Sequence, residues 1–186
     1  RDKHVTGVQT CALPILVHAG DSGYTTHGYA RGGGFGLNME GRYRPSIKSF
    51  NIERAAHDWL ITMSMERMYT RFPGLRVASV ENGSDYLALL LRKLGQQASK
   101  TPGWFDDDPV ELFRQHVWMN PFWEDDVYEL VDLMGADHVI FGSDWPHIEG
   151  LPTPLDFLSE VEDLSEEDRR MVMRDNGRGL TELRPA

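Results

Sequence analysis

The stretch HVIFGSDWPHIEG, residues 138–150, joins a short apolar run to polar side chains placed directly after it. The run HVIFG is almost continuously apolar, which is typical of a strand that is buried on both faces. Asp144 and His147 follow within a few residues. The stretch therefore predicts a buried strand whose end carries side chains able to do chemistry.

Other apolar runs of the same kind recur along the chain, and helical patterns lie between them. The further predicted strands are ILVHA (15–19), RVASV (76–80) and HVWMN (116–120). The predicted helices cover about 54–72, the segment after Ser84, 124–134 closed by Gly135, and 166–175 opened by Ser165 and Asp168. Residues 20–45 and 95–109 are predicted to be connections. Strands that alternate with helices predict an α/β fold with parallel strands.

The charge and hydropathy of the chain indicate which classes of molecule it binds. The chain has 186 residues, a formal net charge of -10 and a mean hydropathy of -0.43. Such an acidic surface repels phosphate backbones, and no apolar run approaches the roughly 20 residues of a membrane helix. We therefore expect a cytoplasmic protein that binds a small molecule rather than nucleic acid or membrane, and a homo-oligomer is compatible with the sequence.

The first fifteen residues are treated apart from the rest. VTGVQTCALPI (5–15) resembles a translated sequencing adapter, and RDKH before it fits flanking adapter and index bases. A genuine N-terminal segment is the alternative. We expect residues 1–15 to be non-native and residues 16–186 to form one domain truncated at its N-terminus. The only cysteine, Cys11, lies in this segment, so no disulfide or thiolate metal site is predicted.

Each predicted strand ends in a residue that can do chemistry: His18, Glu81, Asn120 and Asp144. In a (β/α)₈ barrel the active site is assembled at the carboxyl ends of the strands. Taken singly, each residue has an ordinary structural explanation, such as a loop histidine or an aspartate in a turn. Their recurrence at all four strand ends favours a site.

The motifs carry a family resemblance. VHAGDSGY, FPGLRVASVENGSDYLALLLRKL, VWMNPFWEDD, HVIFGSDWPHIEG and RDNGRGLTEL resemble the C-terminal half of amidohydrolase-related, metal-dependent barrel enzymes. That group includes aminocarboxymuconate-semialdehyde decarboxylase and related carboxy-lyases. The resemblance covers almost everything from Val17 onward, and it implies the second half of a (β/α)₈ TIM barrel, strands 5–8 with their helices.

The resemblance also implies one divalent metal ion, with Zn²⁺ as the expected ion. By position, His18 is similar to the family's strand-5 histidine ligand and Asp144 to its strand-8 aspartate ligand. The family's His-x-His pair on strand 1 has no counterpart in the chain. We therefore expect the chain by itself to be inactive.

The chain departs from the family's decarboxylases at one position. Where they carry a His-Gly-Gly motif after strand 6, this sequence reads ENG, with Glu81 in place of the histidine. Glu81 could transfer a proton, orient a ligand or bind a substrate hydroxyl. His147, Trp145, Asn120 and Trp123 are candidate substrate contacts, the two tryptophans as walls for a planar substrate.

These observations predict a metal-dependent hydrolase that acts on a small organic substrate through a metal-activated water. Asp144 would both bind the metal and take the proton of that water. The alternative is a metal-dependent carboxy-lyase acting on a small carboxylic acid, in which an acid protonates the carbon that loses carbon dioxide. A third reading is a barrel that only binds a ligand or assembles with other chains.

Overall fold

The computed structural model describes residues 14–20, 23, 47–147 and 150–182. The expectation that residues 1–15 are non-native falls on residues outside this part of the chain, except for Pro14 and Ile15. Most of the predicted connection 20–45 also lies outside it. Within the described residues, no helix is long and apolar enough to cross a membrane.

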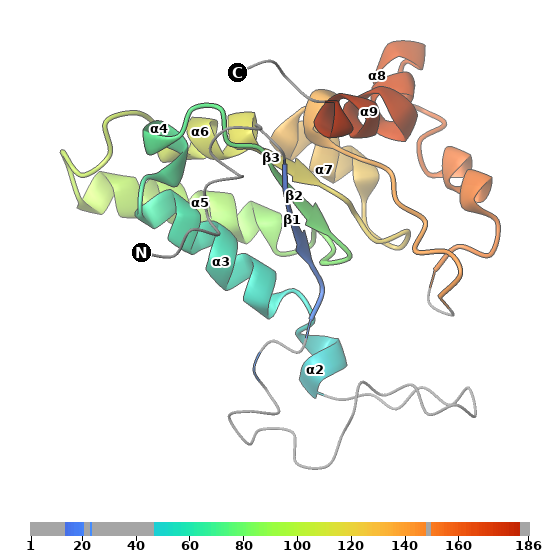
Figure 1. Cartoon of the computed structure of the whole chain (residues 1–186), viewed down its shortest axis with the longest axis horizontal. Helices are drawn as coiled ribbons and strands as arrows, with labels where there is room; N and C mark the ends of the chain where they lie inside the picture. The colour runs from blue at the N-terminus through green and yellow to red at the C-terminus, as the bar shows by residue number, and fades with distance from the viewer. Residues whose placement is uncertain (1–13, 21–22, 24–46, 148–149, 183–186) are drawn as a thin grey trace, which may run out of the picture.

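A parallel sheet forms the centre of the structure (Figure 1). Its strands are β1 (Ile15–His18), β2 (Val77–Val80) and β3 (Val117–Met119), in the order β1-β2-β3. Both pairings are parallel, with His18 opposite Val80 and Ser79 opposite Met119. The α/β fold with parallel strands is therefore confirmed, and three of the predicted strands form within their predicted bounds.

The fourth predicted strand, 138–142, is reduced to a single bridge. Val139 pairs in parallel with Met119, and the Ile140 amide donates to the Met119 carbonyl at 2.9 Å. The next free amide, that of Phe141, donates to the carbonyl of Val172 in the C-terminal helical region at 3.0 Å. The prediction of a full strand was wrong, since only this single bridge forms beside β3.

Helical segments connect the strands and complete the chain. They are α2 (Ile47–Phe50), α3 (Arg54–Met65), α4 (Met68–Arg71), α5 (Leu87–Lys100), α6 (Pro109–His116) and α7 (Val127–Met134). After these come η1 (Ala136–His138), η2 (Pro154–Ser159), α8 (Glu166–Arg170), the π-helical η3 (Met171–Asp175) and α9 (Asn176–Thr181). The last three follow one another without a gap, so the predicted helix 166–175 exists and continues to Thr181.

One helix prediction and one loop prediction need correction. The predicted helix 54–72 is broken at Arg67, whose φ of 54° is left-handed and cannot continue a helix. Residues 95–109 are not one connection, because α5 continues to Lys100 and α6 begins at Pro109. The sequence carried the signal for α6, since Asp108 accepts from the Val110 amide as an N-cap and a proline follows it.

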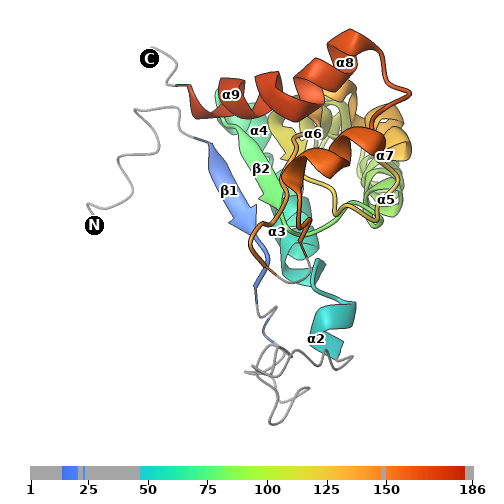
Figure 2. The same cartoon turned by 90° about the vertical axis from the view of Figure 1, so that its right-hand side faces the viewer.

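The two faces of the sheet are covered very differently. One face, called the outer face here, packs its side chains Val77, Val117, Met119 and Val139 into the main core with residues of α3, α5, α6 and α7. On the opposite, inner face, Ala78 and Ile140 form a small cluster with Leu180 of α9. Figure 2 shows β1 at the margin of the molecule, with the helices gathered to one side of it.

The C-terminal helix α9 lies over the end of the sheet where the strands begin (Figure 1). The buried Arg76, just before β2, donates to the Gly179 carbonyl of α9 at 2.9 Å. A guanidinium at the carboxyl end of a helix satisfies carbonyls that have no partner within the helix. The residues of the predicted site lie at the opposite edge of the sheet, where the strands end.

Candidate metal centre at the carboxyl edge of the sheet

His18 and Glu81, at the ends of β1 and β2, are in direct contact. Nε2 of His18 lies 3.0 Å from Oε2 of Glu81. Nδ1 of His18 lies 3.1 Å from the Ala19 carbonyl, and in the tautomer that donates there, Nε2 keeps its lone pair toward the centre of the site. Histidines that bind metals are usually oriented in this way, by donating their second ring N–H to a carbonyl or carboxylate.

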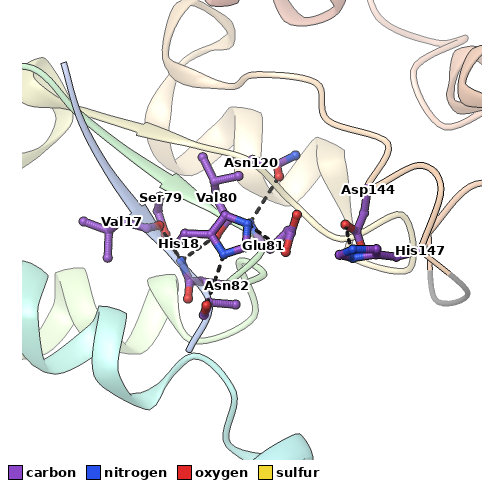
Figure 3. Close-up of polar contacts among 10 residues, drawn as sticks. Val17, His18, Ser79, Val80, Glu81, Asn82, Asn120, Asp144 and His147 are labelled. Atoms are coloured by element: carbon purple, nitrogen blue, oxygen red, sulfur yellow. Dashed lines mark hydrogen bonds and ion pairs between the residues drawn. The ribbon is translucent and has the colours of Figure 1, made fainter. Parts of the chain in front are cut away.

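Asp144 and His147 form a second pair, three residues apart in the stretch after the isolated bridge. Nδ1 of His147 lies 2.9 Å from Oδ1 of Asp144. One ligand atom each from Glu81, Asp144 and His147 lies within 4.8 Å of the other two. Figure 3 shows the Glu81 carboxylate between His18 and the Asp144–His147 pair. Three of the four predicted strand ends therefore contribute side chains to one cluster.

The two carboxylates are more enclosed than the two imidazoles. The side chains of Glu81 and Asp144 are 23% and 22% exposed, whereas those of His18 and His147 are 57% and 61% exposed. The carboxylates thus lie toward the protein and the imidazoles toward the solvent. A cation bound among them would be reached from the solvent side.

Both carboxylate residues have a backbone conformation that is rare for residues other than glycine. The φ angle is 56° at Glu81 and 53° at Asp144. Such left-handed conformations cost free energy and persist only where the surrounding structure holds them, which is common at functional sites. At Glu81 this conformation comes directly after β2, and at Asp144 it comes in the segment after the isolated bridge.

The proximity of the carboxylates changes their electrostatics. Burial raises the pKa of Glu81, the neighbouring Asp144 raises it further, and His18 and His147 act in the opposite direction. Two carboxylates at such distances resist ionising together unless a cation lies between them. Imidazole nitrogen and carboxylate oxygen are suitable ligands for Zn²⁺, so the donor set fits a divalent ion.

Asn120, at the end of β3, is buried and its side-chain atoms contact the protein. Its Oδ1 accepts from the Glu81 amide at 3.3 Å, and its Nδ2 donates to the carbonyls of Pro121 at 3.2 Å and Ile140 at 3.4 Å. It thus connects the ends of β2 and β3 with the bridge residues that follow. Its role as a substrate contact stays a prediction.

Two tryptophans are predicted as walls for a planar substrate. Trp145 exposes most of its surface, and Trp123 exposes nearly half. Trp145 follows Asp144 directly, and Trp123 lies in the connection between β3 and α7. Because no substrate is present, the predicted substrate contacts of these tryptophans and of His147 are not tested.

Two polar residues that shape the site were not among the predicted site residues. Nδ2 of the buried Asn82 donates to the Val17 carbonyl at 2.8 Å and the Val80 carbonyl at 2.9 Å, which ties the ends of β1 and β2 together. Asp125 accepts from the Ser84 amide, the Ser84 hydroxyl and the Phe122 amide. Local sequence gives no signal for these contacts, since WEDD reads as the acidic opening of a helix.

Comparison with known proteins places this site in a family. The family model described as amidohydrolase matches residues 12–180. The chain belongs to the amidohydrolase family. No curated protein matches the chain. Members of the family are mostly metal-dependent enzymes, which agrees with the predicted resemblance and with the donor set at the carboxyl edge.

Solved structures show the same relationship. An amidohydrolase from Mycobacterium avium subsp. paratuberculosis K-10 is 38% identical over 92% of this chain, with a TM-score of 0.78. A 5-carboxyvanillate decarboxylase from Sphingomonas paucimobilis is 17% identical over 93% of the chain, with a TM-score of 0.64. A dihydroxybenzoic acid decarboxylase from Polaromonas sp. JS666, solved with manganese and 2-nitroresorcinol, is 17% identical over 70%, with a TM-score of 0.56.

This chain matches only part of each solved structure. It covers 43%, 50% and 40% of the lengths of these three proteins, in the order given. The two decarboxylases, at their low identity, show a shared fold only. The narrower likeness to aminocarboxymuconate-semialdehyde decarboxylase stays a prediction.

Proposed function

We propose that this member of the amidohydrolase family is a metal-dependent hydrolase of a small organic substrate, and that His18, Asp144, Glu81 and His147 surround its metal ion. The observation that carries the proposal is the convergence of Glu81, Asp144 and His147 on one point, with ligand atoms within 4.8 Å of one another. Glu81 follows β2, whereas Asp144 and His147 lie together in the segment after the isolated bridge, so local turn formation alone does not account for the meeting of Glu81 with this pair.

Each residue has a distinct task in this proposal. A bound Zn²⁺ would act as a Lewis acid and lower the pKa of a coordinated water to about 7. Asp144 accepts the proton of the attacking water and then donates it to the leaving group. His147, in contact with Asp144 at 2.9 Å, orients the carboxylate for this transfer. Glu81, whose Oε2 lies 3.0 Å from Nε2 of His18, would add a second carboxylate to the negative charge around the ion.

The proposal includes the architecture of a (β/α)₈ barrel, of which these residues form the C-terminal half. The parallel sheet with its main core on one face supports it, because a barrel keeps its helices outside and its interior free of them. An open doubly wound sheet carries helices on both faces. The chain covers 43% of the length of the M. avium protein, which agrees with the proposed half of a barrel.

A carboxy-lyase is the second candidate, and the environment of Glu81 favours it. Burial and the adjacent Asp144 raise the pKa of Glu81, so its carboxyl group retains a proton more readily than an exposed glutamate. An acid of this kind could protonate the carbon that loses carbon dioxide. Two of the structural neighbours are titled as decarboxylases.

Metal content tests the metal centre. The change is Asp144→Ala, and its matched control is Asp132→Ala, which removes the same charge from an exposed position on α7. Elemental analysis of the full-length protein of the proposed barrel, purified from medium with Zn²⁺, should show the ion depleted in Asp144→Ala and unchanged in Asp132→Ala. Unchanged metal in Asp144→Ala would remove Asp144 from the ligand set.

Product analysis separates the two reactions. In the full-length protein of the proposed barrel, small esters, amides and lactones should be hydrolysed with release of acid, whereas hydroxybenzoates should release no carbon dioxide if the enzyme is a hydrolase. Carbon dioxide released in step with loss of the carboxylate, and absent in Glu81→Gln, would favour the carboxy-lyase instead.

A further inference from the structure

Two loops at the carboxyl edge are joined along their length. The first, residues 81–84, follows β2 and begins with Glu81, and the second, residues 120–125, follows β3. At one end, the Glu81 amide donates to Oδ1 of Asn120 at 3.3 Å. At the other end, Oδ2 of Asp125 accepts from the Ser84 amide at 2.7 Å and from the Ser84 hydroxyl at 2.9 Å.

The loops also touch between these two ends. A Cβ atom built at Gly83, where φ is 64°, would lie 2.7 Å from Cδ2 of the Phe122 ring. The Phe122 amide in turn donates to Oδ2 of Asp125 at 3.0 Å. Gly83 therefore passes beneath Phe122 with no room for a side chain, and a single carboxylate oxygen fixes both loops.

The Asp125 contacts are the stronger of the two connections. A hydrogen bond to an ionised carboxylate is roughly twice as strong as one between neutral groups. Asp125 accepts three such bonds, whereas the Glu81 amide makes one longer bond, to the neutral side chain of Asn120. Because Glu81 has an unfavourable left-handed φ of 56°, its conformation has to be imposed by neighbours of this kind.

Asp125 is not needed to start α7. That task belongs to Asp126, whose Oδ1 accepts from the amides of Tyr128 and Glu129, each at 3.0 Å. The two adjacent aspartates therefore have separate structural tasks, one in the loops and one in the helix. Their adjacency offers a matched pair of variants.

We propose that Asp125 is a positioning residue for Glu81: by binding Ser84 and Phe122 it holds the loop 81–84 in the one conformation that directs the Glu81 carboxylate toward His18 and Asp144. This inference rests on the proposed function for its consequence in metal binding, but its structural part does not. Asn82 fixes the same loop to β1 and β2 through the Val17 and Val80 carbonyls, and Asp125 fixes it to the loop 120–125.

The structural part is tested by amide hydrogen exchange of the metal-free protein, measured by NMR. Asp125→Asn is compared with Asp126→Asn, and the Leu91 amide in α5 reports global unfolding. In Asp125→Asn the Glu81 and Ser84 amides should exchange about tenfold faster or more, with Leu91 unchanged. In Asp126→Asn the Glu81 amide should keep its protection. Unchanged exchange at Glu81 in Asp125→Asn overturns the proposal.

A second variant guards against loss of the fold. Ser84→Ala removes the hydroxyl donor but keeps the amide donor, so it should accelerate exchange at Glu81 less than Asp125→Asn does. If Asp125→Asn does not fold, exchange in Ser84→Ala decides the question, and no change at Glu81 overturns the proposal.

The consequence for metal binding is tested in the full-length protein of the proposed barrel with Zn²⁺ and a competing chelator. Asp125→Asn should weaken Zn²⁺ binding about tenfold or more, as loss of groups that orient ligands usually does. In a Glu81→Gln background the same change should have almost no further effect, because it acts through Glu81. Equal effects in both backgrounds overturn the proposal. Absence of Zn²⁺ binding in the unsubstituted protein contradicts the proposed function instead, and leaves the exchange experiment to decide the role of Asp125.

Discussion

The two faces of the sheet differ in almost every physical property. The outer face contributes Val77, Val117 and Met119, all fully buried, to a core shared with α3, α5, α6 and α7. On the inner face, Leu16 of β1 is 62% exposed although it lies beside the buried Ala78. The side chains of the candidate metal centre follow the strands at the edge of this second face.

This difference separates stability from chemistry. Burial of apolar side chains is the main favourable contribution to folding, and most of it lies on the outer face. The candidate centre is held by hydrogen bonds between loops and contains two carboxylates that repel each other. Substitutions on the outer face should therefore lower stability, and substitutions in the centre should lower metal binding or turnover.

The largest expected effect contrasts two leucines. Leu90→Ala in α5 should lower the free energy of unfolding by about 2–5 kcal/mol, because the side chain is fully buried in the outer core. Leu16→Ala on the inner face should change it by less than about 0.5 kcal/mol, because the side chain is largely exposed. Urea denaturation followed by circular dichroism measures both. A cost at Leu16 equal to that at Leu90 would mean that the inner face is covered in solution.

Glu81→Gln tests the prediction that substitutions in the candidate metal centre lower turnover rather than stability. In the full-length protein of the proposed barrel, turnover should fall by roughly 10²-fold or more if Glu81 transfers a proton, the usual contribution of a positioned acid or base. The free energy of unfolding should not fall, because the change removes a half-buried carboxylate whose neighbour Asp144 repels it. Steady-state kinetics and urea denaturation of the same preparations check both. Near-normal turnover would return Glu81 to a structural role in the turn.

Gly83→Ala should affect stability by an intermediate amount. The new Cβ would require the Phe122 ring to move and would place an alanine at a φ of 64°, for a cost of about 1–3 kcal/mol. The control is Gly74→Ala, where a Cβ meets nothing within 4 Å. Thermal unfolding compares the two variants. Equal melting temperatures would show that the two loops adjust without cost.

The smallest effect concerns pH. Burial raises the pKa of Asp125 above its ordinary value, against the opposing hydrogen bonds from Ser84 and Phe122. In the pH range between the unfolded and folded pKa values the folded state binds more protons, so the stability contributed by Asp125 falls as pH rises through that range. The free energy of unfolding of the protein minus that of Asp125→Asn should therefore decrease from about pH 4 upward. An increase would mean that the hydrogen bonds outweigh burial.

The fold was predictable where a local pattern and a long-range contact agree. Continuous apolar runs predicted β1, β2 and β3, and the caps at Ser165 and Gly135 lie where helices begin and end. The run 138–142 has the same composition, yet it forms only a single bridge with β3, and its Phe141 amide donates to the carbonyl of the distant Val172. Sequence spacing carries no information about that contact.

The same limit applies to the site. The convergence of Glu81 and Asp144 follows from their place at strand ends, which parallel topology brings to one edge. The proximity of His147 to Asp144 follows from their spacing of three residues. The contacts of Asp125 with Ser84 join residues far apart in the chain, and nothing in either local sequence predicts them.

The contact between Phe141 and Val172 has a consequence for assembly. It lies where the π-helical turn η3 meets the sheet, and it uses an amide that another strand would need for pairing. At the other edge of the sheet, β1 pairs with β2 on one side, and among the described residues no strand pairs with its other side. Growth of a fibril by strand addition needs a receptive edge at both ends of every unit. If copies of this chain join through their strands, we therefore expect the association to stop at closed pairs.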